Sequence, residues 1–416
     1  MEYGCIGEKL GHSFSKEIHN ALTDYDYQLK ELTKDELPLF MEEHNFKAIN
    51  VTIPYKQDVI PYLYWISDEA KAINAVNTVV NVDGKLYGYN TDFYGLKALI
   101  EKENVSLKGK KVVVLGSGGT SNTAFAVANS MGAQRVLKVS RSPRDNYITY
   151  EELYEKHTDC EIIINTTPCG MFPKINVSAV DINRFTNLEA VFDAVYNPLS
   201  SKLVLDAKEK GITAVGGLYM LVMQAAYAVE KFINKPVDFK KADGIFKTLY
   251  KDKMNIVLIG MPASGKSTVG KALSKALGKS FADADEKITE AEEKSIPEIF
   301  AEHGEKYFRA VESNVIHGLS MNNSQVIATG GGVILNKTNI DVLKGNGRVY
   351  FIDRPLDMLI TTNDRPLSSN RADLEKRYNE RYRLYKSYAD VLIEGSGSVE
   401  EVSKRIEVDF SEYSCN

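Results

Sequence analysis

Two stretches of this sequence each combine a short apolar run, a glycine-rich turn and a helix-like pattern. One is GKKVVVLGSGGTSNTAFAVANSMGA, which begins at Gly109, and the other is NIVLIGMPASGKSTVGKAL, which begins at Asn255. A strand that leads through glycines into a helix directs backbone N–H groups and the positive end of the helix dipole at a phosphate. The chain is therefore predicted to contain two phosphate-binding loops in two different regions.

Short apolar runs alternate with helical patterns along most of the 416 residues, as in KAINVTI, RVLKVS, EIIINTT, AVFDAVY, QVIATGG and RVYFID. This alternation predicts an α/β fold in which helices cover parallel sheets. A chain of this length is too long to fold around one hydrophobic core, so we expect two or three domains. Polar stretches near 105–110 and 250–254 mark the predicted domain boundaries. The predicted domains are residues 1–105, completed by helices at about 217–250, then residues 106–216, and residues 254–416.

Composition excludes several classes of protein. The formal net charge of -5 argues against a nucleic-acid-binding protein, which usually carries a basic surface. The first residues lack the basic and apolar segments of a signal peptide, and the apolar stretch at 218–229 is too short to span a bilayer. The four cysteines form no CxxC pair. We therefore expect a cytoplasmic protein without zinc, membrane association or an obligate protein partner.

The second loop, Gly260–Ser267, reads GMPASGKS and fits the pattern G-x-x-x-x-G-K-[ST]. In such a loop the lysine, here Lys266, reaches the β- and γ-phosphates of ATP, and the hydroxyl of Ser267 coordinates Mg²⁺. The predicted ATP-binding residues are Gly260, Ala263, Ser264, Gly265, Lys266, Ser267 and Thr268.

Downstream residues predict a small acidic substrate for this loop. Asp283 and Asp285 are expected on one face of an extended segment, with one carboxylate for Mg²⁺ and the other for a substrate hydroxyl. The glycine run at 330–332 permits close approach of a ligand. Three arginines, Arg309, Arg365 and Arg381, together form a candidate anion clamp.

Residues 254–416 resemble shikimate kinase in the order and spacing of GMPASGKSTVG, FADADEKI, IPEIFAEHGEKYFRAVES, ATGGGVI, RPL and ERYRLYKSYAD. The resemblance implies a P-loop kinase domain in which Asp283 supports the metal and Asp285 holds or deprotonates the shikimate 3-hydroxyl. It further implies that the substrate is bound by Arg309, Gly331, Gly332 and Arg381, and that Arg365 lies in a lid over the phosphates. Ala263 departs from the family, which commonly has glycine at this position.

The first loop, GSGGTSNTA from Gly116, is an incomplete G-x-G-x-x-G, because Ser121 replaces the third glycine. The next predicted strand ends in Ser140 and Arg141, with Arg144 just beyond, and offers no acidic residue for a ribose hydroxyl. An arginine at this position suits a 2′-phosphate, so NADP is favoured over NAD.

Polar residues in the first 92 positions suggest a site for a polyhydroxylated ring. Their hydroxyl, amide and carboxylate groups belong to Ser13, Ser15, Asn50, Thr52, Asn77 and Asp92. We expect Lys56 and Asp92 to form a proton-transfer pair, in which the carboxylate orients the ammonium group.

Residues 1–250 resemble shikimate dehydrogenase through HSFS, NVTIPYK, AVNT, NTD, the G-x-G-G loop, INTTPCGM and GGLYMLVMQAA. The resemblance implies a substrate domain followed by a Rossmann domain for NADP. Its implied substrate contacts are Ser13, Ser15, Asn50, Thr52, Lys56, Asn77, Asp92, Tyr196 and Gln224. Its implied NADP contacts are Gly116, Gly118, Gly119, Ser140, Arg141, Thr166, Gly217 and Met220. Lys16 and Ser140 replace a proline and an asparagine that are common in the family.

The two resemblances predict one bifunctional enzyme. Its first part would reduce 3-dehydroshikimate to shikimate with NADPH, and its second would phosphorylate shikimate to shikimate 3-phosphate with MgATP. One alternative is a quinate-type dehydrogenase fused to a kinase for another small carboxylated alcohol. A non-catalytic sensor is disfavoured, because Lys56, Asp92, Lys266 and Asp285 are all present.

Overall fold

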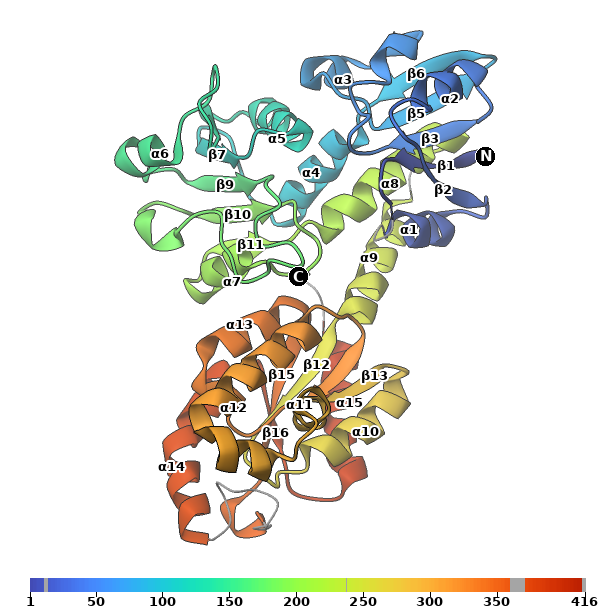
Figure 1. Cartoon of the computed structure of the whole chain (residues 1–416). Helices are drawn as coiled ribbons and strands as arrows, with labels where there is room; N and C mark the ends of the chain where they lie inside the picture. The colour runs from blue at the N-terminus through green and yellow to red at the C-terminus, as the bar shows by residue number, and fades with distance from the viewer. Residues whose placement is uncertain (11–13, 237, 360–370, 414–416) are drawn as a thin grey trace. The chain divides into compact units, whose positions relative to one another are not determined.

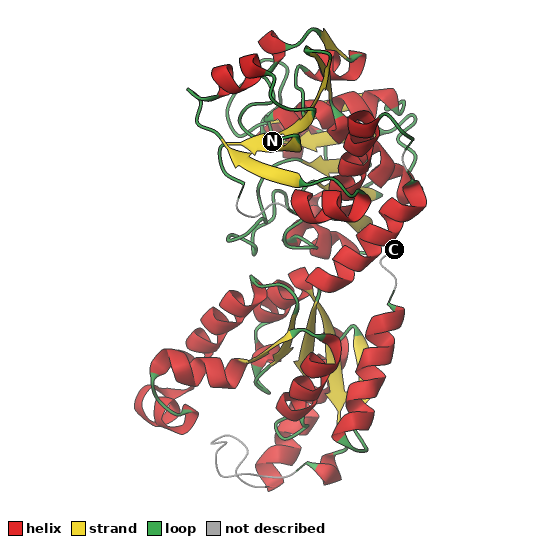
Figure 2. Cartoon of the chain, turned by 90° about the vertical axis from the view of Figure 1, so that its right-hand side faces the viewer, coloured by secondary structure: helices red, strands yellow, loops and turns green. Residues whose placement is uncertain are grey.

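A computed structural model describes residues 1–10, 14–236, 238–359 and 371–413. Its chain divides into two compact units. Unit 1 comprises residues 1–170, 178–196 and 206–249, and unit 2 comprises residues 171–177, 197–205 and 250–416. Helices flank three separate sheets (Figures 1 and 2). The α/β class predicted from the alternating pattern is confirmed, while the three-domain division stays a prediction.

The first sheet of unit 1 is mixed and has the order β2-β1-β3-β5-β6-β4. Its strands are β1 (Tyr3–Gly7), β2 (Tyr27–Glu31), β3 (Ala48–Val51), β4 (Trp65–Ile66), β5 (Thr78–Val82) and β6 (Lys85–Tyr89). Strand β1 runs parallel to β2 and β3, whereas β5 and β6 form an antiparallel hairpin. The hairpin turns at Asp83 and Gly84, which have φ values of 51° and 80°, as a tight turn between two strands requires.

Helices cover both faces of this sheet. They are α1 (Ser15–Leu22), α2 (Leu37–Glu43), α3 (Asp68–Ile73), α4 (Thr91–Lys102) and α8 (Leu218–Ile233), with the 3₁₀ turn η1 (Ile60–Tyr62). Leu37, Phe40 and Met41 of α2 pack with Ile6 and Ile49 of the sheet. Ala228 and Phe232 of α8 belong to a second apolar cluster, which also contains Cys5 and Tyr27.

The second sheet is fully parallel, with the order β11-β10-β9-β7-β8. Its strands are β7 (Lys111–Leu115), β8 (Arg135–Val139), β9 (Ile162–Asn165), β10 (Ala190–Asp193) and β11 (Thr213–Val215). The associated elements are α5 (Gly119–Ser130), α6 (Tyr150–Lys156), α7 (Lys202–Glu209) and η2 (Ile182–Arg184). The chain leaves β7 toward β8 and returns on the other side at β9. The carboxyl ends of β7 and β9 thus form a topological switch point, where such sheets bind ligands.

The third sheet, in unit 2, is also parallel and has the order β13-β14-β12-β15-β16. Its strands are β12 (Asn255–Ile259), β13 (Ser280–Asp283), β14 (Gln325–Ala328), β15 (Gly347–Asp353) and β16 (Val391–Glu394). Figure 1 shows α12 and α13 on one side of this sheet and α10 and α15 on the other. Its switch point lies at the end of β12, which is flanked by β14 and β15.

The helices of unit 2 are α10 (Lys266–Leu277), α11 (Ala284–Glu292), α12 (Ile296–Ser320), α13 (Lys337–Asn346), α14 (Arg371–Tyr388) and α15 (Val399–Glu412), with η3 (Val333–Leu335) and η4 (Leu356–Met358). Helix α9 (Phe239–Lys253) belongs to unit 1 up to Leu249. Helix α9 continues to Lys253 rather than ending near Tyr250, so Met254 alone separates it from β12. The ammonium group of Lys279 donates to the carbonyls of Lys251, Asp252 and Met254, and so satisfies oxygens that the helix end leaves unpaired.

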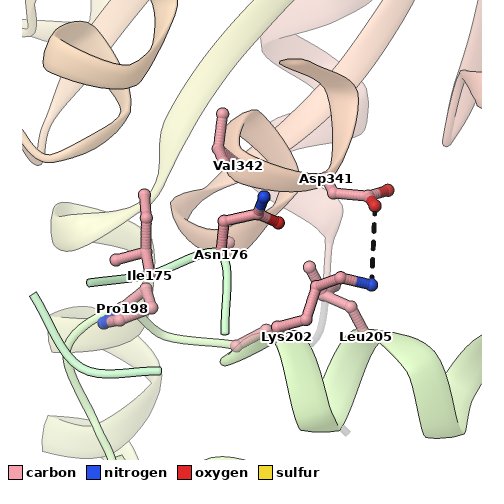
Figure 3. A pocket seen from close by; sticks show the side chains of 9 residues that line it. Ile175, Asn176, Pro198, Lys202, Leu205, Asp341 and Val342 are labelled. Atoms are coloured by element: carbon pink, nitrogen blue, oxygen red, sulfur yellow. Dashed lines mark ion pairs between the residues drawn. The ribbon is translucent and has the colours of Figure 1, made fainter. Parts of the chain in front are cut away.

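A small pocket in unit 2 lies beside α13 (Figure 3). It is lined by Ile175, Asn176, Pro198, Ser200, Lys202, Leu205, Asp341, Val342 and Gly345. Its volume of about 10 Å³ holds roughly one water molecule. None of the predicted site residues lines this pocket. In the part of the chain that the structure describes, we find no helix with the length and apolarity needed to cross a bilayer.

Candidate active sites

The first candidate site centres on an ion pair between Lys56 and Asp92. Lys56 follows β3, and Asp92 lies in the first turn of α4, which Asn90 caps by accepting a hydrogen bond from the Phe93 N–H. The Lys56 Nζ atom lies 2.6 Å from Asp92 Oδ2, and the two side chains are 20% and 14% exposed. This partial burial strengthens the attraction, yet leaves the pair accessible to a ligand.

Asn50 and Asn77 belong to one buried hydrogen-bond network. The Asn50 Oδ1 atom accepts from the Tyr27 hydroxyl at 2.7 Å, and its Nδ2 donates to Asn77 O and Thr78 Oγ1. Because both ends of the Asn50 amide have partners, Tyr27 holds this side chain in one orientation. Asn50 is 7% exposed, and its hydrogen bonds link Tyr27 with Asn77 and Thr78.

The same network extends to Thr91 and Gln224. The Asn77 Oδ1 atom accepts from the Thr91 N–H at 2.7 Å, and the Thr91 hydroxyl lies 3.5 Å from Gln224 Oε1. Tyr27, Thr78 and Thr91 connect the predicted residues, although none of them was predicted from the sequence as a site residue. Thr91 has a sequence signal, since it lies within the quoted NTD motif, but Tyr27 on β2 has none.

The remaining predicted substrate residues lie in three places. Thr52 directly follows β3, and its methyl group would clash with a Cβ on Gly7 at 2.6 Å. Ser15 opens α1. The Tyr196 ring lies 5.5 Å from the Phe14 ring, and burial raises the pKa of the Tyr196 hydroxyl. Ser13 lies outside the described residues.

The predicted dinucleotide loop lies at the switch point of the second sheet. Gly116 has φ of 114°, and a Cβ there would lie 2.6 Å from Thr166 Oγ1, so only glycine fits between β7 and the end of β9. Gly118 and Gly119, at the start of α5, have no heavy atom within 4 Å of an added Cβ. The loop therefore has an open surface at a helix N-terminus, which suits a pyrophosphate group.

The other predicted NADP residues surround this loop. Arg141 is exposed after β8, Ser140 is buried, and the Arg144 Nη1 atom donates to Ser117 O at 2.9 Å. Thr166 Oγ1 donates to Leu115 O at 2.6 Å. Gly217 and Met220 lie at the start of α8, and a Cβ on Gly217 would lie 2.4 Å from Ala194 O.

The second candidate site is built on the loop between β12 and α10. Gly260, Ala263 and Gly265 have φ values of 153°, 65° and 91°. Ala263 is thus an alanine in a left-handed conformation, which glycine adopts without strain. Ser264 is buried beneath the loop, and Thr268 is exposed in the first turn of α10. Lys266 Nζ donates to Gly260 O and Met261 O at 2.9 Å, inside the loop.

Asp283 and Asp285 do not share one face of a strand, and that expectation is wrong. Asp283 ends β13 and caps α11, because its Oδ1 accepts from the N–H of Asp285, which is already helical. The Asp283 Oδ2 atom accepts from Ser267 Oγ at 2.5 Å. The two predicted metal ligands therefore converge, which one carboxylate and one hydroxyl must do to hold Mg²⁺ beside a phosphate. No cluster of three or more acidic, histidine or cysteine side chains arranged for a metal occurs among the described residues.

Asp285 lies beside a buried acid, Glu312, that was not among the residues predicted from the sequence. A Cβ on Gly330 would lie 2.8 Å from Asp285 Oδ1 and 2.9 Å from Glu312 Oε1, so both carboxylates flank this glycine. Glu312 is 1% exposed, and its Oε2 accepts from Arg309 Nη1 at 2.8 Å. Burial raises the pKa of Glu312, while Arg309 opposes the rise. Its sequence signal is the i, i+3 spacing from Arg309.

The predicted arginine clamp lies around the glycines that follow β14. A Cβ on Gly332 would lie 2.1 Å from Arg309 Nη1, and the Gly331 carbonyl accepts from Arg381 Nη1 at 3.1 Å. The Tyr385 hydroxyl also donates to that carbonyl, at 2.5 Å. Arg309 and Arg381 thus meet at Gly331 and Gly332, close to Asp285. Arg365 lies outside the described residues.

Family models match both regions. The model for the shikimate dehydrogenase substrate binding domain matches residues 5–79, and the model for shikimate kinase matches residues 262–409. The chain is 38% identical over 261 residues to a shikimate dehydrogenase (NADP(+)) of Clostridium beijerinckii, an alignment that covers 59% of this chain and 96% of the relative. A Clostridium perfringens shikimate dehydrogenase (NADP(+)) is 40% identical over 265 residues, with 59% and 97% covered.

Solved structures match a similar share of the chain. A chorismate mutase/shikimate 5-dehydrogenase fusion protein from Clostridium acetobutylicum has a TM-score of 0.57 and 37% identity, and the match covers 59% of this chain and 96% of that one. A Thermus thermophilus shikimate 5-dehydrogenase in complex with NADP(H) and shikimate has a TM-score of 0.54 and 27% identity, with 59% and 98% covered.

Proposed function

Because the chain belongs to the shikimate dehydrogenase family and also carries a shikimate kinase domain, we propose that it catalyses two consecutive reactions. The first is reduction of 3-dehydroshikimate to shikimate with NADPH, and the second is phosphorylation of shikimate to shikimate 3-phosphate with MgATP. The observation that carries the proposal is the Lys56–Asp92 pair at 2.6 Å, because a ketone reduction needs a positioned proton donor.

In the reduction, a hydride adds to the carbonyl carbon and a proton must reach the carbonyl oxygen. NADPH supplies the hydride when bound. Lys56 gives its proton to the oxygen as the C–O double bond becomes a single bond, and Asp92 orients the ammonium group until then. Asn77 and Gln224 bind the ring hydroxyls, and the Tyr27–Asn50 hydrogen bond keeps this network in place.

The geometry of the loop supports the proposed NADP residues. Gly118 and Gly119 leave room for the pyrophosphate, and exposed Arg141 binds the 2′-phosphate. The absence of an acid at the end of β8 supports NADPH over NADH, since a carboxylate there would repel that phosphate.

In the phosphorylation, Asp285 accepts the proton of the shikimate 3-hydroxyl, and Arg309 and Arg381 bind the substrate carboxylate. Ser267 and Asp283 would hold Mg²⁺, whose charge offsets that of the phosphates. Buried Glu312 holds the Arg309 guanidinium by an ion pair and acts as a positioning residue. The two arginines beside the glycines favour a carboxylated alcohol as the substrate class.

A one-pot assay on the full chain tests the proposal. The purified protein receives 3-dehydroshikimate, NADPH and MgATP, and products are followed by mass spectrometry. We expect shikimate 3-phosphate. Accumulation of shikimate without the phosphate ester would refute the kinase assignment, and unconsumed 3-dehydroshikimate would refute the dehydrogenase assignment. Parallel reactions with quinate and NADP⁺ test the quinate-type alternative.

A further inference from the structure

The tetrapeptide DRPL occurs twice in the sequence, at 353–356 and at 364–367. The second copy contains Arg365, the predicted lid residue. The first copy begins at Asp353, the last residue of β15, and contains Arg354, to which the resemblance to shikimate kinase assigns no role. Arg354 is therefore a second arginine of the same local sequence, but it is attached to the sheet.

Sheet order places Arg354 beside the phosphate-binding loop. Strands β12 and β15 are parallel neighbours, with Ile259 opposite Phe351, so both chains leave the sheet at the same edge. The loop follows β12, and Arg354 follows β15. The Arg354 Nη1 atom lies 4.0 Å from the position that a Cβ on Gly265 would occupy, and Gly265 caps the N-terminus of α10.

The backbone and side chain of Arg354 are both held in place. The Gly395 N–H donates to Asp353 O at 2.9 Å, and a Cβ on Gly395 would lie 2.8 Å from Arg354 N. The Arg354 Nε atom donates to Met358 O at 3.3 Å. These contacts orient the guanidinium group before any ligand arrives, which lowers the entropic cost of binding.

The positive charge of Arg354 has no acidic partner among the residues that the structure describes. Its Nε bond anchors the side chain to the turn η4, whereas Nη1 points to the loop. If Arg354 only held the turn η4, its charge would be unnecessary, because an uncharged donor of similar length can also form a hydrogen bond to the Met358 carbonyl. A guanidinium beside the N-terminus of α10 suits an anion, because both groups attract negative charge and the planar fork matches phosphate oxygens.

We propose that Arg354 binds the polyphosphate of the nucleotide from the β15 side of the loop, in addition to Lys266 and independently of the lid. This inference rests on the proposed kinase function and adds Arg354 to the residues that bind the nucleotide at that site. The expected ligand class is a nucleoside di- or triphosphate.

The test measures ADP binding to the full chain by isothermal titration calorimetry. Arg354→Gln removes the charge but keeps a donor for the Met358 carbonyl, and Arg354→Lys keeps the charge without the fork. We expect Arg354→Gln to raise the Kd for ADP about tenfold to a hundredfold, the range for one charge-assisted hydrogen bond. Arg354→Lys should raise the Kd less, because the positive charge remains. The matched control is Lys404→Gln, an exposed charge on α15 paired with Glu407.

Kinase kinetics give a second readout. Arg354→Gln should raise KM for ATP and leave KM for shikimate unchanged, and its effect should shrink as salt rises. An unchanged Kd for ADP would overturn the proposal. So would a loss of ADP affinity accompanied by an equal loss of shikimate affinity and a lowered melting temperature, because that combination indicates a structural role. A wild-type protein that binds ADP without phosphorylating shikimate would refute the proposed function alone.

Discussion

His19 makes the first unit sensitive to acid. The side chain lies fully buried on α1, with its ring stacked 3.9 Å from the Tyr27 ring. Its Nδ1 shares a hydrogen bond with the Tyr25 hydroxyl at 2.8 Å, and its Nε2 has no hydrogen-bond partner among the described residues. Burial lowers the pKa of His19 from 6.5 to about 3, although the nearby Asn50 side chain opposes the shift. The folded protein therefore keeps this ring neutral.

The pKa values set the size and sign of the effect. Between pH 6.5 and about 3 the unfolded chain binds a proton at His19 and the folded chain does not. The free energy of unfolding therefore falls as pH decreases through this window, and it does not fall further on this account below the folded pKa. One pKa unit corresponds to about 1.4 kcal/mol. His19 alone should therefore lower the free energy of unfolding by about 2 kcal/mol between pH 7 and pH 5.

The fluorescence of Trp65 is a suitable probe. It is the single tryptophan of the chain and is 42% exposed. It lies on β4, in the sheet that also contains Tyr27 on β2. Urea unfolding of the full chain is measured at pH 7, 6 and 5 for wild type and for His19→Asn, which keeps an acceptor for Tyr25 but does not titrate. His44→Asn, at a partly exposed histidine in the same unit, is the control.

We expect His19→Asn to be less stable at pH 7, because it loses ring packing, but to lose about 2 kcal/mol less than wild type between pH 7 and pH 5. The comparison concerns the change with pH, so the packing loss cancels. If wild type and His19→Asn lose the same free energy over this range, the buried neutral histidine does not control acid stability and the reasoning is wrong.

Three further predictions concern the two sites. Lys56→Ala should lower reductase turnover by about a hundredfold to ten-thousandfold and leave kinase turnover near wild type, and equal loss of both activities would argue against separate sites. Asp285→Asn should lower the kcat for phosphorylation by at least about a hundredfold with little change in ADP affinity, so a collapse of nucleotide binding in calorimetry would contradict its role. Ala263→Gly should remove backbone strain of about 1 kcal/mol at φ of 65° and raise the kinase melting temperature in scanning fluorimetry, whereas a lower melting temperature would contradict this.

Local patterns in the sequence were sufficient for the elements that carry the two loops. A strand, a glycine turn and a helix are specified by neighbouring residues, so the loops at Gly116 and Gly260 were predictable together with the α/β class. The D-x-D motif shows the limit of such patterns. Its spacing suggested that both carboxylates lie on one face of a strand. Instead, Asp283 is the last residue of β13 and accepts hydrogen bonds from N–H groups in the first turn of α11, which begins at Ala284. A capping hydrogen bond here outweighed the periodicity of the strand.

The sequence by itself determined the chemical groups available to each site and the order of the motifs along the chain. Only the tertiary structure decided which groups meet. Lys56 and Asp92, 36 residues apart, form a pair because β3 and α4 converge at one sheet. Tyr27 on β2 reaches Asn50 on β3 across the intervening strand β1, and Arg354 lies near the loop at Gly265 because β15 pairs with β12. These contacts depend on strand order and register, which arise from packing over the whole unit and not from local residue patterns.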